Sequence, residues 1–377
     1  MTVRERINAV LSFENYDKLP IIHFSYWYET LDKWVKEGYI SKEILENFRG
    51  DASVGEVELD KIMGWDQSYG KNACLYYPDL SPLFPNEVIK EFPDGSKHVR
   101  NSYGVVELQK PEAGSIPAEI EHLLVDRKSW EEYYLPKLKF DQSRYTKPEE
   151  DPKAYKEITD PNREMWLSLH YGSIIGTIRN WIGVVNLSYM MADDPELIEE
   201  IVDTYADLQY KCLEESLKKC SNFDSISLWE DICFNYGPLV SPKIFERLCG
   251  KHYKRVAELA NSYGIKFCHV DCDGKTDDIA ATWVNNGINI MFPIEVGTWN
   301  GSYAAHREKY GKKVLGVGGM DKKVFAYDKK AVDAEIERLK PIIDMGGFIP
   351  CPDHRIAPDA KFELVCYYVE QMRKLYS

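Results

Sequence analysis

The stretch Ile265-Lys-Phe-Cys-His-Val-Asp-Cys-Asp-Gly274 decides the fold class, because a short apolar segment runs directly into polar, metal-capable side chains. Its first half predicts a buried strand, and Gly274 predicts the turn that follows. The side chains at the end of this strand are His269, Asp271, Cys272 and Asp273. Ligands of α/β folds bind just beyond the carboxyl ends of the strands. The stretch therefore predicts one part of a binding site.

The same order of strand and then helix recurs with short links along the rest of the chain. Helices are predicted between the strands, among them residues 194–219, 242–263 and 331–345. Strands that alternate with helices pair in parallel through right-handed crossovers. Eight such strands predict an α/β protein with a (β/α)8 TIM barrel, in a single domain over residues 1–377. The predicted strands are residues 20–25, 51–59, 165–169, 223–228, 265–270, 288–292, 314–317 and 348–350.

Residues 71–161 depart from this repeat. Prolines are frequent there, and charges come in blocks such as Lys147-Pro-Glu-Glu-Asp-Pro152. Residues 88–92, a Pro-Asp-Gly turn at 93–95 and residues 97–108 predict a β-hairpin and a further strand. We interpret the region as an insertion after the second strand. It is either a lid over the mouth of the barrel or a solvated decoration, since long insertions tend to be functional or disordered.

The composition narrows the class of protein. The chain has 377 residues, 44% of them hydrophobic, and a net charge of −14, so it can bury a large core but offers little attraction to nucleic acid or anionic membranes. No apolar run approaches the roughly 18 residues of a membrane helix, and residues 1–6 are followed by no apolar signal core. Nine cysteines without framework spacing predict a reduced, cytoplasmic protein.

Metal-capable residues follow three of the predicted strands. His269, Glu295 and Cys351 end the fifth, sixth and eighth strands by this count, and neighbouring strand ends in a barrel can reach one point above its axis. Zinc prefers imidazole, thiolate and carboxylate ligands, and a catalytic zinc leaves one position open for substrate. Asp271 is the fourth candidate ligand, and Cys272 competes with it. Each residue alone is also typical of an ordinary core, so the metal site is predicted from the set.

Two polar pairs and a group of ring-bearing side chains complete the predicted site. Glu230 with Asp231 and Asp353 with His354 are either acid–base groups or groups that orient a metal-bound histidine, and salt bridges are the plain alternative. The catalytic candidates among them are Glu230, Asp353 and His354. Ring-bearing residues near the strand ends predict a flat-walled pocket for an uncharged ligand. These substrate-binding candidates are Tyr26, Trp27, His170, Tyr171, Trp229 and Tyr236.

Several short motifs make the chain resemble the uroporphyrinogen decarboxylase-like superfamily over nearly its full length. This resemblance implies a (β/α)8 barrel. It also implies one of two chemistries, namely decarboxylation of a porphyrinogen without a cofactor, or zinc-dependent methyl transfer to or from a corrinoid protein. The motifs are Arg4-Glu-Arg-Ile7, Asp17-Lys-Leu-Pro20, Glu230-Asp231 with Gly237-Pro238 and Ser241-Pro242, His269-Val-Asp271 with Gly274, Gly316-Val-Gly-Gly-Met-Asp321 and Gly346-Gly-Phe-Ile-Pro-Cys-Pro-Asp-His354.

The segment after the first predicted strand separates these two chemistries. The decarboxylase branch carries arginines there, because its substrate bears many carboxylates, whereas this chain has Phe24-Ser-Tyr-Trp-Tyr-Glu29. The methyltransferase branch has a His-x-Cys motif and a later Cys as zinc ligands. This chain keeps His269 and Cys351 but has Asp271 in place of the first Cys. The resemblance then implies an oxygen-richer zinc site, suited to an ether or hydroxyl oxygen of the substrate.

The resulting expectation is a zinc-dependent methyltransferase of the O-demethylase type. A methoxylated, aromatic small molecule would bind above the barrel, with zinc acting on the leaving oxygen. Its methyl group would pass to the Co(I) corrinoid (cobalamin) of a separate partner protein, since the chain shows no corrinoid-binding motif of its own. A homodimer is compatible with the sequence. Two other classes stay open, namely a cofactor-free decarboxylase and a non-catalytic corrinoid-binding protein.

Overall fold

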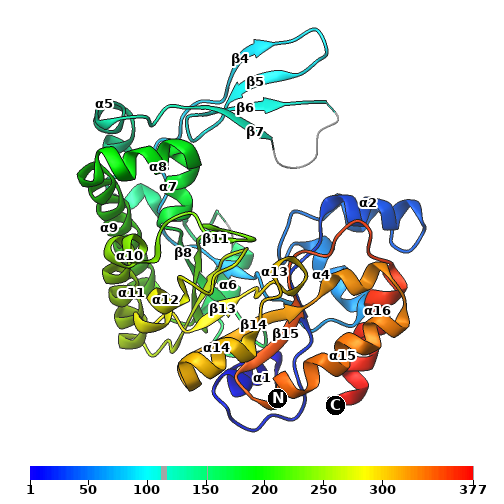
Figure 1. Ribbon diagram of the computed structural model, residues 1–377. Helices are drawn as coiled ribbons and strands as arrows, with labels where there is room; N and C mark the ends of the chain where they lie inside the picture. The colour runs from blue at the N-terminus through cyan, green and yellow to red at the C-terminus, as the bar shows by residue number, and fades with distance from the viewer. Residues whose placement is uncertain (112–116, 151, 377) are drawn as a thin grey trace.

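A mostly parallel sheet forms the centre of the molecule (Figure 1). The computed structural model describes residues 1–111, 117–150 and 152–376. Within them, seven strands pair in parallel in the order β15-β14-β13-β12-β9-β8-β3. The α/β class predicted from the sequence is confirmed. The strands are β3 (Asn72–Ala73), β8 (Ser168–Gly172), β9 (Ser225–Trp229), β12 (Phe267–Asp271), β13 (Ile290–Phe292), β14 (Leu315–Met320) and β15 (Phe348–Pro352).

The strands predicted from residue 165 onward all exist, shifted by a few residues. They are predictable because most of their residues are buried and many are apolar, as is typical of parallel strands covered by helices. Every residue of β14 and β15 is buried. The register sets Asp271 at the end of β12 opposite Trp229 of β9 and Phe292 of β13. The carboxyl ends of these three strands therefore lie at one level.

Two short strands near the N-terminus stand beside this sheet. β1 (Ile22–His23) and β2 (Gln67–Ser68) pair in parallel with each other. Tyr26, after β1, forms a parallel bridge with Ile356, after β15. The Gln67 side chain bonds the N–H and the carbonyl of Trp166, at 2.8 and 3.3 Å. Among the described residues, the backbone ladders of β1 and β2 do not join those of the seven-stranded sheet into a closed ring.

The strand predicted at residues 51–59 is wrong, because this segment belongs to the helix α4 (Val54–Met63). Val54 and Val57 suggested strand alternation, but both side chains are at least 40% exposed. The helix ends at Gly64, which adopts the left-handed conformation that glycine reaches without steric cost. β2, a few residues further along, takes the place of the second predicted strand.

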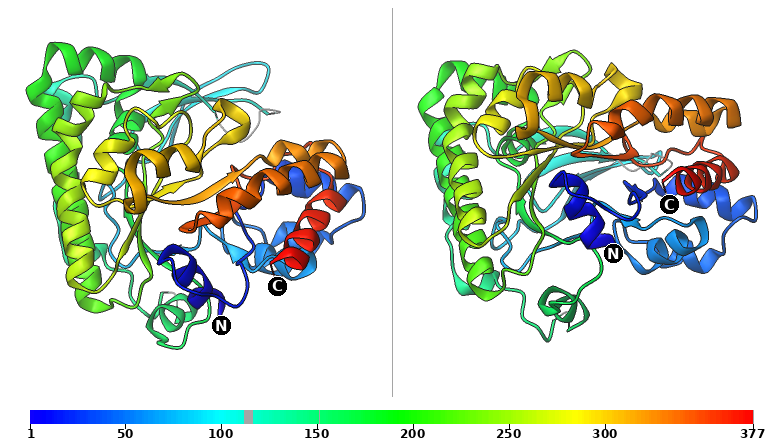
Figure 2. Two further views of the ribbon diagram at one scale, coloured as in Figure 1. Left: turned by 60° about the horizontal axis from the view of Figure 1, so that its bottom comes forward. Right: turned by 90° about the horizontal axis from the view of Figure 1, so that it is seen from below.

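Helices surround the central sheet in all three views (Figures 1 and 2). The longest, α9 (Pro195–Lys219), runs beside α11 (Lys251–Ser262), and α15 (Lys329–Asp344) packs against α16 (Phe362–Leu375). Within the described ranges, no helix has both the length and the apolar character to cross a membrane. The other helices are α1 (Val3–Leu11), α2 (Tyr28–Lys36), α3 (Lys42–Glu46), α5 (Arg127–Ser129), α6 (Pro152–Thr159), α7 (Ile175–Ile182), α8 (Val184–Asp193), α10 (Pro242–Phe245), α12 (Ala280–Asn285), α13 (Val296–Trp299) and α14 (Tyr303–Tyr310), with π-helical or 3-10 segments at Trp130–Tyr134, Leu135–Lys137, Gln142–Arg144, Glu246–Gly250, Gly311–Lys313 and Lys322–Ala326.

A four-stranded antiparallel sheet stands apart from the central sheet (Figure 1, cyan). It confirms the predicted hairpin and adds a fourth strand. The predicted insertion at residues 71–161 begins too early, because Asn72–Ala73 forms β3 of the central sheet. Its residues 112–116 and 151 lie outside the described residues, and its role as a lid stays a prediction. Its strands are β4 (Glu87–Glu91), β5 (Lys97–Arg100), β6 (Val105–Gln109) and β7 (Ala118–His122), and a separate small hairpin consists of β10 (Cys233–Phe234) and β11 (Gly237–Pro238).

Gly318 of β14 tests how closely the central sheet is packed. Its φ is +121°, and a Cβ added there would lie 1.6 Å from the carbonyl oxygen of Pro293. We expect Gly318→Ala to lower the free energy of unfolding by more than about 3 kcal/mol, since backbone strain and steric overlap add. Gly264→Ala is the control: its φ is +80°, and an added Cβ would meet nothing within 4 Å. Chemical denaturation should give a loss of only about 1–2 kcal/mol there, and equal losses would contradict the packing.

Candidate active site

A cavity of about 410 Å³ opens at the carboxyl ends of β8, β9 and β12. Residues that follow β1, β2 and β15 also reach its wall, so segments far apart in the sequence meet there. This is the position at which α/β folds bind ligands. Acidic, basic and aromatic side chains line it: Phe24, Trp27, Asp51, Tyr69, Lys71, Asn72, His170, Trp229, Asp231, His269, Asp271, Asp273, Phe292, His354 and Arg355.

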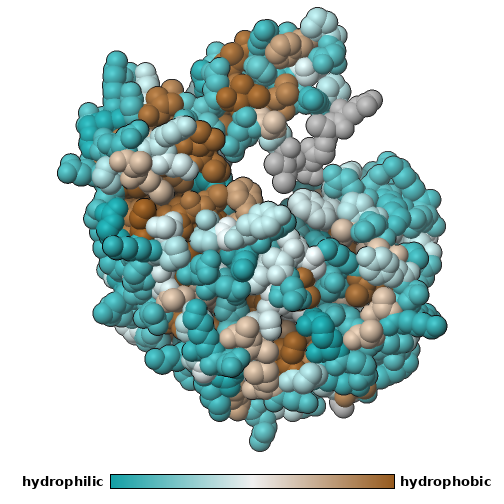
Figure 3. All heavy atoms as spheres, in the orientation of Figure 1, coloured by the Kyte–Doolittle hydropathy of each residue, from teal (hydrophilic) through white to brown (hydrophobic). Residues whose placement is uncertain are grey.

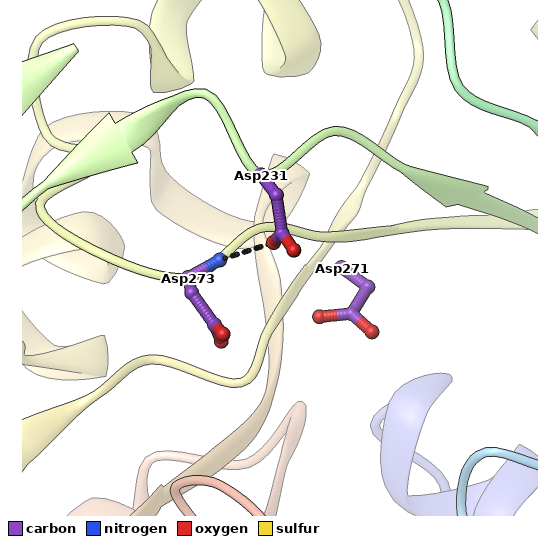
Figure 4. Close-up of side chains that lie close together, drawn as sticks. All are labelled: Asp231, Asp271 and Asp273. Atoms are coloured by element: carbon purple, nitrogen blue, oxygen red, sulfur yellow. Dashed lines mark hydrogen bonds between the residues drawn. The ribbon is translucent and has the colours of Figure 1, made fainter. Parts of the chain in front are cut away.

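Three aspartates converge on one part of this wall (Figure 4). Asp271 ends β12, Asp273 lies in the turn that follows, and Asp231 comes shortly after β9. Each offers one carboxylate oxygen, and these three oxygens lie within 4.8 Å of one another. They meet because β9 and β12 pair in parallel with their carboxyl ends in register. We call these three residues the aspartate cluster.

Neighbouring donors hold two of the three carboxylates. The N–H of Asp273 donates to Asp231 Oδ1 at 3.1 Å, and Trp229 Nε1 donates to Asp231 Oδ2 at 3.0 Å. His354 Nε2 lies 3.1 Å from Asp273 Oδ2. The backbone of Asp231 has a φ of +36°, which few non-glycine residues adopt. The backbone strain at Asp231 therefore accompanies the placement of its carboxylate in the cluster.

Repulsion between like charges governs the chemistry of the cluster. Burial raises the pKa of Asp271 well above its usual range, and the charges of Asp273 and Asp231 raise it further. Burial and then Asp273 raise the pKa of Asp231 in the same way. Two unit charges 4.8 Å apart repel by roughly 3 kcal/mol at an effective dielectric constant of about 20. The cluster therefore favours a bound proton or a bound cation.

Two histidines on the cavity wall are neutral at physiological pH. Burial lowers the pKa of His170 to about 4. Burial, together with the nearby His170, lowers the pKa of His269 to about 3. His269 Nδ1 lies 3.3 Å from Ser225 Oγ, and its ring packs on Tyr69. The Tyr69 hydroxyl is buried without a hydrogen-bond partner among the described residues.

A second cavity of about 370 Å³ lies next to the first and shares the wall residues His170 and Trp229 with it. Aromatic side chains make up much of its surface, and Asp79 and Asn180 supply polar groups. Such a wall suits a flat, largely apolar group. The aromatic residues that line it, besides Trp229, are Tyr77, Tyr103, Trp181 and Tyr205.

Comparison with known proteins yields a likeness in structure alone. No family model matches the chain, and no curated protein is similar to it in sequence. A solved methyltransferase from Methanosarcina mazei matches over 100% of this chain and 99% of its own, with a TM-score of 0.60 and 16% sequence identity. A protein assigned as a vitamin-B12-independent methionine synthase from Listeria monocytogenes covers 96% of this chain and 98% of its own, with a TM-score of 0.39 and 13% identity. The first likeness shows a shared fold, and the second is too low to carry an argument.

The predicted metal ligands are not brought together as one set. Only Asp271 belongs to the aspartate cluster, the one group of three ligand atoms this close among the described residues. His269 lines the cavity, but Cys351 is 0% exposed and is not part of the cavity wall. Glu295 accepts a backbone hydrogen bond at 2.6 Å from the turn after β12. Cys272, the alternative to Asp271, is buried, and its thiol faces a backbone carbonyl.

Two of the predicted catalytic residues, Glu230 and Asp353, are buried and accept hydrogen bonds from backbone N–H groups. Glu230 is 0% exposed and accepts hydrogen bonds from the turn between β8 and α7 and from the Tyr253 hydroxyl, at 2.6–3.2 Å. Asp353 is buried and accepts from three backbone N–H groups. Burial raises the pKa of both carboxyls, and neither is part of the cavity wall. His354 is the catalytic candidate that reaches the cavity.

The predicted substrate-binding residues fall into two groups. Three of them, Trp27, His170 and Trp229, line a cavity. The other three do not face either cavity. Tyr26 and Tyr171 are each 1% exposed in the core, and Tyr236 is 97% exposed at the tip of the hairpin formed by β10 and β11.

Asp231 and Asp273 are absent from the predicted ligand set, although both lie at predicted strand ends. Successive side chains along a strand point to opposite sides, so one of Glu230 and Asp231 faces the cavity while the other turns away. The sequence alone does not show which one does. Tyr69 is missing for another reason, because it follows β2 and the predicted second strand lies elsewhere.

The four donors around Glu230 predict a role in stability. In Glu230→Gln, an NH2 group replaces one carboxylate oxygen. This NH2 group cannot accept the hydrogen bonds that the oxygen accepts in the wild type. We expect the free energy of unfolding in urea to fall by about 1–3 kcal/mol. Glu370→Gln is the control, since it removes one exposed ion pair with Lys374 and should cost less than about 0.5 kcal/mol. A Glu230→Gln protein as stable as the wild type would contradict the anchoring role.

The depressed pKa of His170 predicts a pH-dependent stability. The pKa of a free histidine is about 6.5, and that of His170 is lowered to about 4, so the folded state binds fewer protons between these values. Its contribution is present above about pH 6.5 and is lost as the pH falls toward 4. His170→Gln should make this decline in unfolding free energy shallower in urea titrations between pH 7 and about 4.5. The control His98→Gln, on the outlying sheet, should keep the wild-type slope, and identical slopes for both variants would refute the assignment.

Proposed function

We propose that the chain is a methyltransferase that removes a methyl group from a methoxylated, aromatic small molecule. The observation that carries the proposal is an aspartate-lined cavity at the strand ends of a fold shared, over the full length, with a methyltransferase from Methanosarcina mazei. The motifs that resemble the uroporphyrinogen decarboxylase-like superfamily support the same reaction class. Three clustered carboxylates would repel a polycarboxylate substrate, which disfavours the decarboxylase alternative.

The cavity walls suggest how such a substrate would bind. Trp27 and Trp229 line the first cavity, and Trp229 also borders the more aromatic second cavity. We propose that the ring stacks on these indoles and extends toward the second cavity, with the methoxyl group beside the aspartate cluster. Neutral His170, on the wall common to both cavities, would donate or accept a hydrogen bond to the ring substituents.

The leaving oxygen needs a proton when its bond to the methyl carbon breaks. His354 lines the cavity, its Nε2 is bonded to Asp273, and its ring stacks on Trp27 with centroids 5.6 Å apart. We propose that His354 holds this proton. In the reaction, the C–O bond breaks, the methyl group moves to the acceptor, and the freed oxygen takes the proton.

The acceptor is proposed to be the corrinoid of a partner protein. When bound, a Co(I) corrinoid supplies a strong nucleophile for the methyl carbon. Exposed apolar side chains gather at the end of the molecule where a partner could dock (Figure 3). Phe234 and Tyr236 are 60% and 97% exposed on the hairpin next to the aspartate cluster, and Val185 and Tyr189 of α8 are 66% and 65% exposed. Exposed apolar surface of this kind is typical of interaction sites.

A thiolate-bound zinc does not fit these residues. Cys351 is fully buried, and the thiol, imidazole and carboxylate of Cys351, His269 and Glu295 do not form a ligand group among the described residues. The oxygen atoms of the aspartate cluster are the ligands that harder cations prefer. We therefore derive no step through a thiolate-bound zinc.

Other features of the proposed enzyme concern its architecture and setting. The bridge between Tyr26 and Ile356 and the Gln67 contacts to Trp166 support a closed (β/α)8 barrel with interrupted ladders. The insertion at residues 71–161 is proposed as a lid on a single domain. A cytoplasmic location and a homodimer complete the proposal.

Phenol release tests the reaction. The purified chain is mixed with chemically reduced cobalamin and a panel of methoxyarenes, and the free phenol is measured by chromatography. We expect release from at least one donor, and His354→Gln should slow it by about 10²–10⁴-fold, the range for a lost acid–base group. Asp333→Asn on α15 is the control, because this exposed carboxylate accepts only from Tyr367 in the described structure. No release from any donor would refute the proposed function.

A further inference from the structure

The aspartate cluster has the spacing of a cation site. Ligand oxygens about 2.1–2.4 Å from one hard cation lie about 3–4.8 Å from one another in octahedral geometry. The three oxygens of Asp231, Asp271 and Asp273 lie within 4.8 Å of one another. No hydrogen bond reaches the Asp271 carboxylate from any described residue, so this ligand is free to bind.

The Lys and Arg side chains on this wall, and Arg179 nearby, are engaged elsewhere. Arg355 donates to Asp51 at 3.1 Å, and Lys71 pairs with Glu157. Arg179 donates to the backbone carbonyl of Asp231 and to Asn180, not to a carboxylate of the cluster. Within the described part of the chain, no Lys or Arg forms an ion pair with the cluster. Three carboxylates therefore face one directly bonded basic group, His354, among the described residues.

Buried polar groups that lack partners provide a second, independent sign of a ligand. His269 is 5% exposed and lines the cavity, and because Ser225 occupies its Nδ1, no described residue bonds its Nε2. Tyr69 is 1% exposed and lines the same cavity, and its hydroxyl has no partner among the described residues. Buried polar groups are normally satisfied, so the Tyr69 hydroxyl, beside the unbonded Nε2 of the buried His269, indicates a polar ligand in this cavity.

We propose that Asp231, Asp271 and Asp273 hold one divalent metal ion through carboxylate oxygens, with water or a substrate oxygen in its remaining positions. Mg²⁺ and Mn²⁺ are the ions that such an all-oxygen set favours. His354 orients Asp273 through the 3.1 Å contact between Nε2 and Oδ2. The site does not depend on the methyl-transfer proposal, since binding is measured without turnover. Of the four ligands predicted from the sequence, this site keeps Asp271 and excludes His269, Glu295 and Cys351.

Metal binding to the chelator-stripped full chain is the first test. Titration with Mn²⁺, followed by electron paramagnetic resonance, should show one bound ion per chain. Asp271→Asn and Asp273→Asn should each weaken binding by more than about 100-fold, because loss of a group that only orients a ligand already costs about 10–100-fold. His354→Gln should weaken Mn²⁺ binding by about 10–100-fold. The matched control Asp333→Asn should bind as the wild type does.

Thermal unfolding separates a ligand role from a merely structural one. Without metal, Asp271→Asn should not lower the melting temperature, because a neutral amide replaces a buried carboxyl whose ionisation its two neighbours oppose. With Mn²⁺, the wild-type melting temperature should rise while that of Asp271→Asn stays unchanged. The proposal would be overturned if metal-free Asp271→Asn melted at a lower temperature than the metal-free wild type and if Mn²⁺ raised the melting temperature of both proteins equally.

The Co²⁺ spectrum of the wild-type protein tests the ligand type without any variant. An oxygen-liganded Co²⁺ lacks the intense thiolate-to-cobalt charge-transfer band of a cysteine site. Such a band, abolished by Cys351→Ser, would overturn the proposal. The proposal would also be overturned if the protein bound no Mn²⁺ but bound tetramethylammonium in this cavity. The cluster would then recognise an organic cation. Mn²⁺ binding without phenol release would refute the methyl-transfer proposal alone.

Discussion

Repulsion among three carboxylates, held against one another by the register of two strands, is the constraint on which the site depends. β9 and β12 pair in parallel with Trp229 opposite Asp271, and the Glu230 N–H donates to the Asp271 carbonyl at 2.9 Å. The two strand ends therefore cannot separate without breaking backbone hydrogen bonds. The fold keeps like charges together and, among the described residues, pairs them with no Lys or Arg and with the single histidine His354, which is the pattern of a site that awaits a cation or a proton.

The polar pair after β9 divides two tasks between adjacent residues. Glu230 turns into the protein, where its four hydrogen bonds tie the turn after β8 to the end of β9 and to Tyr253 of α11. Asp231 turns the other way, into the cavity, with a strained backbone. Asp353 and His354 after β15 repeat this division, with a buried anchor followed by a cavity residue. In both pairs, the first residue fixes the backbone that positions the second.

The sequence predicts the architecture better than the atoms of the site. Strands from residue 165 onward are predictable because each is a short, largely buried segment that is followed by a polar turn and a helix. The structure of residues 51–59 is not predictable in this way. Val54 and Val57 fit the alternating pattern of a strand, although the chain there is helical. Site residues follow from the rule that ligands bind at carboxyl ends of strands. Which side chain enters the cavity depends on strand parity and local φ, as Asp231 shows, and Cys351 illustrates how a correct strand end can still bury its side chain.

The wall shared by the two cavities has a consequence for the range of ligands. His170 and Trp229 border both spaces and form the partition between them. Trp229 donates to Asp231 of the aspartate cluster, whereas His170 makes no hydrogen bond to the cluster among the described residues, so a change at His170 leaves the charged end in place. Substitution of His170 would therefore alter the space available to the tail of a ligand without removing a contact of the charged end of the pocket.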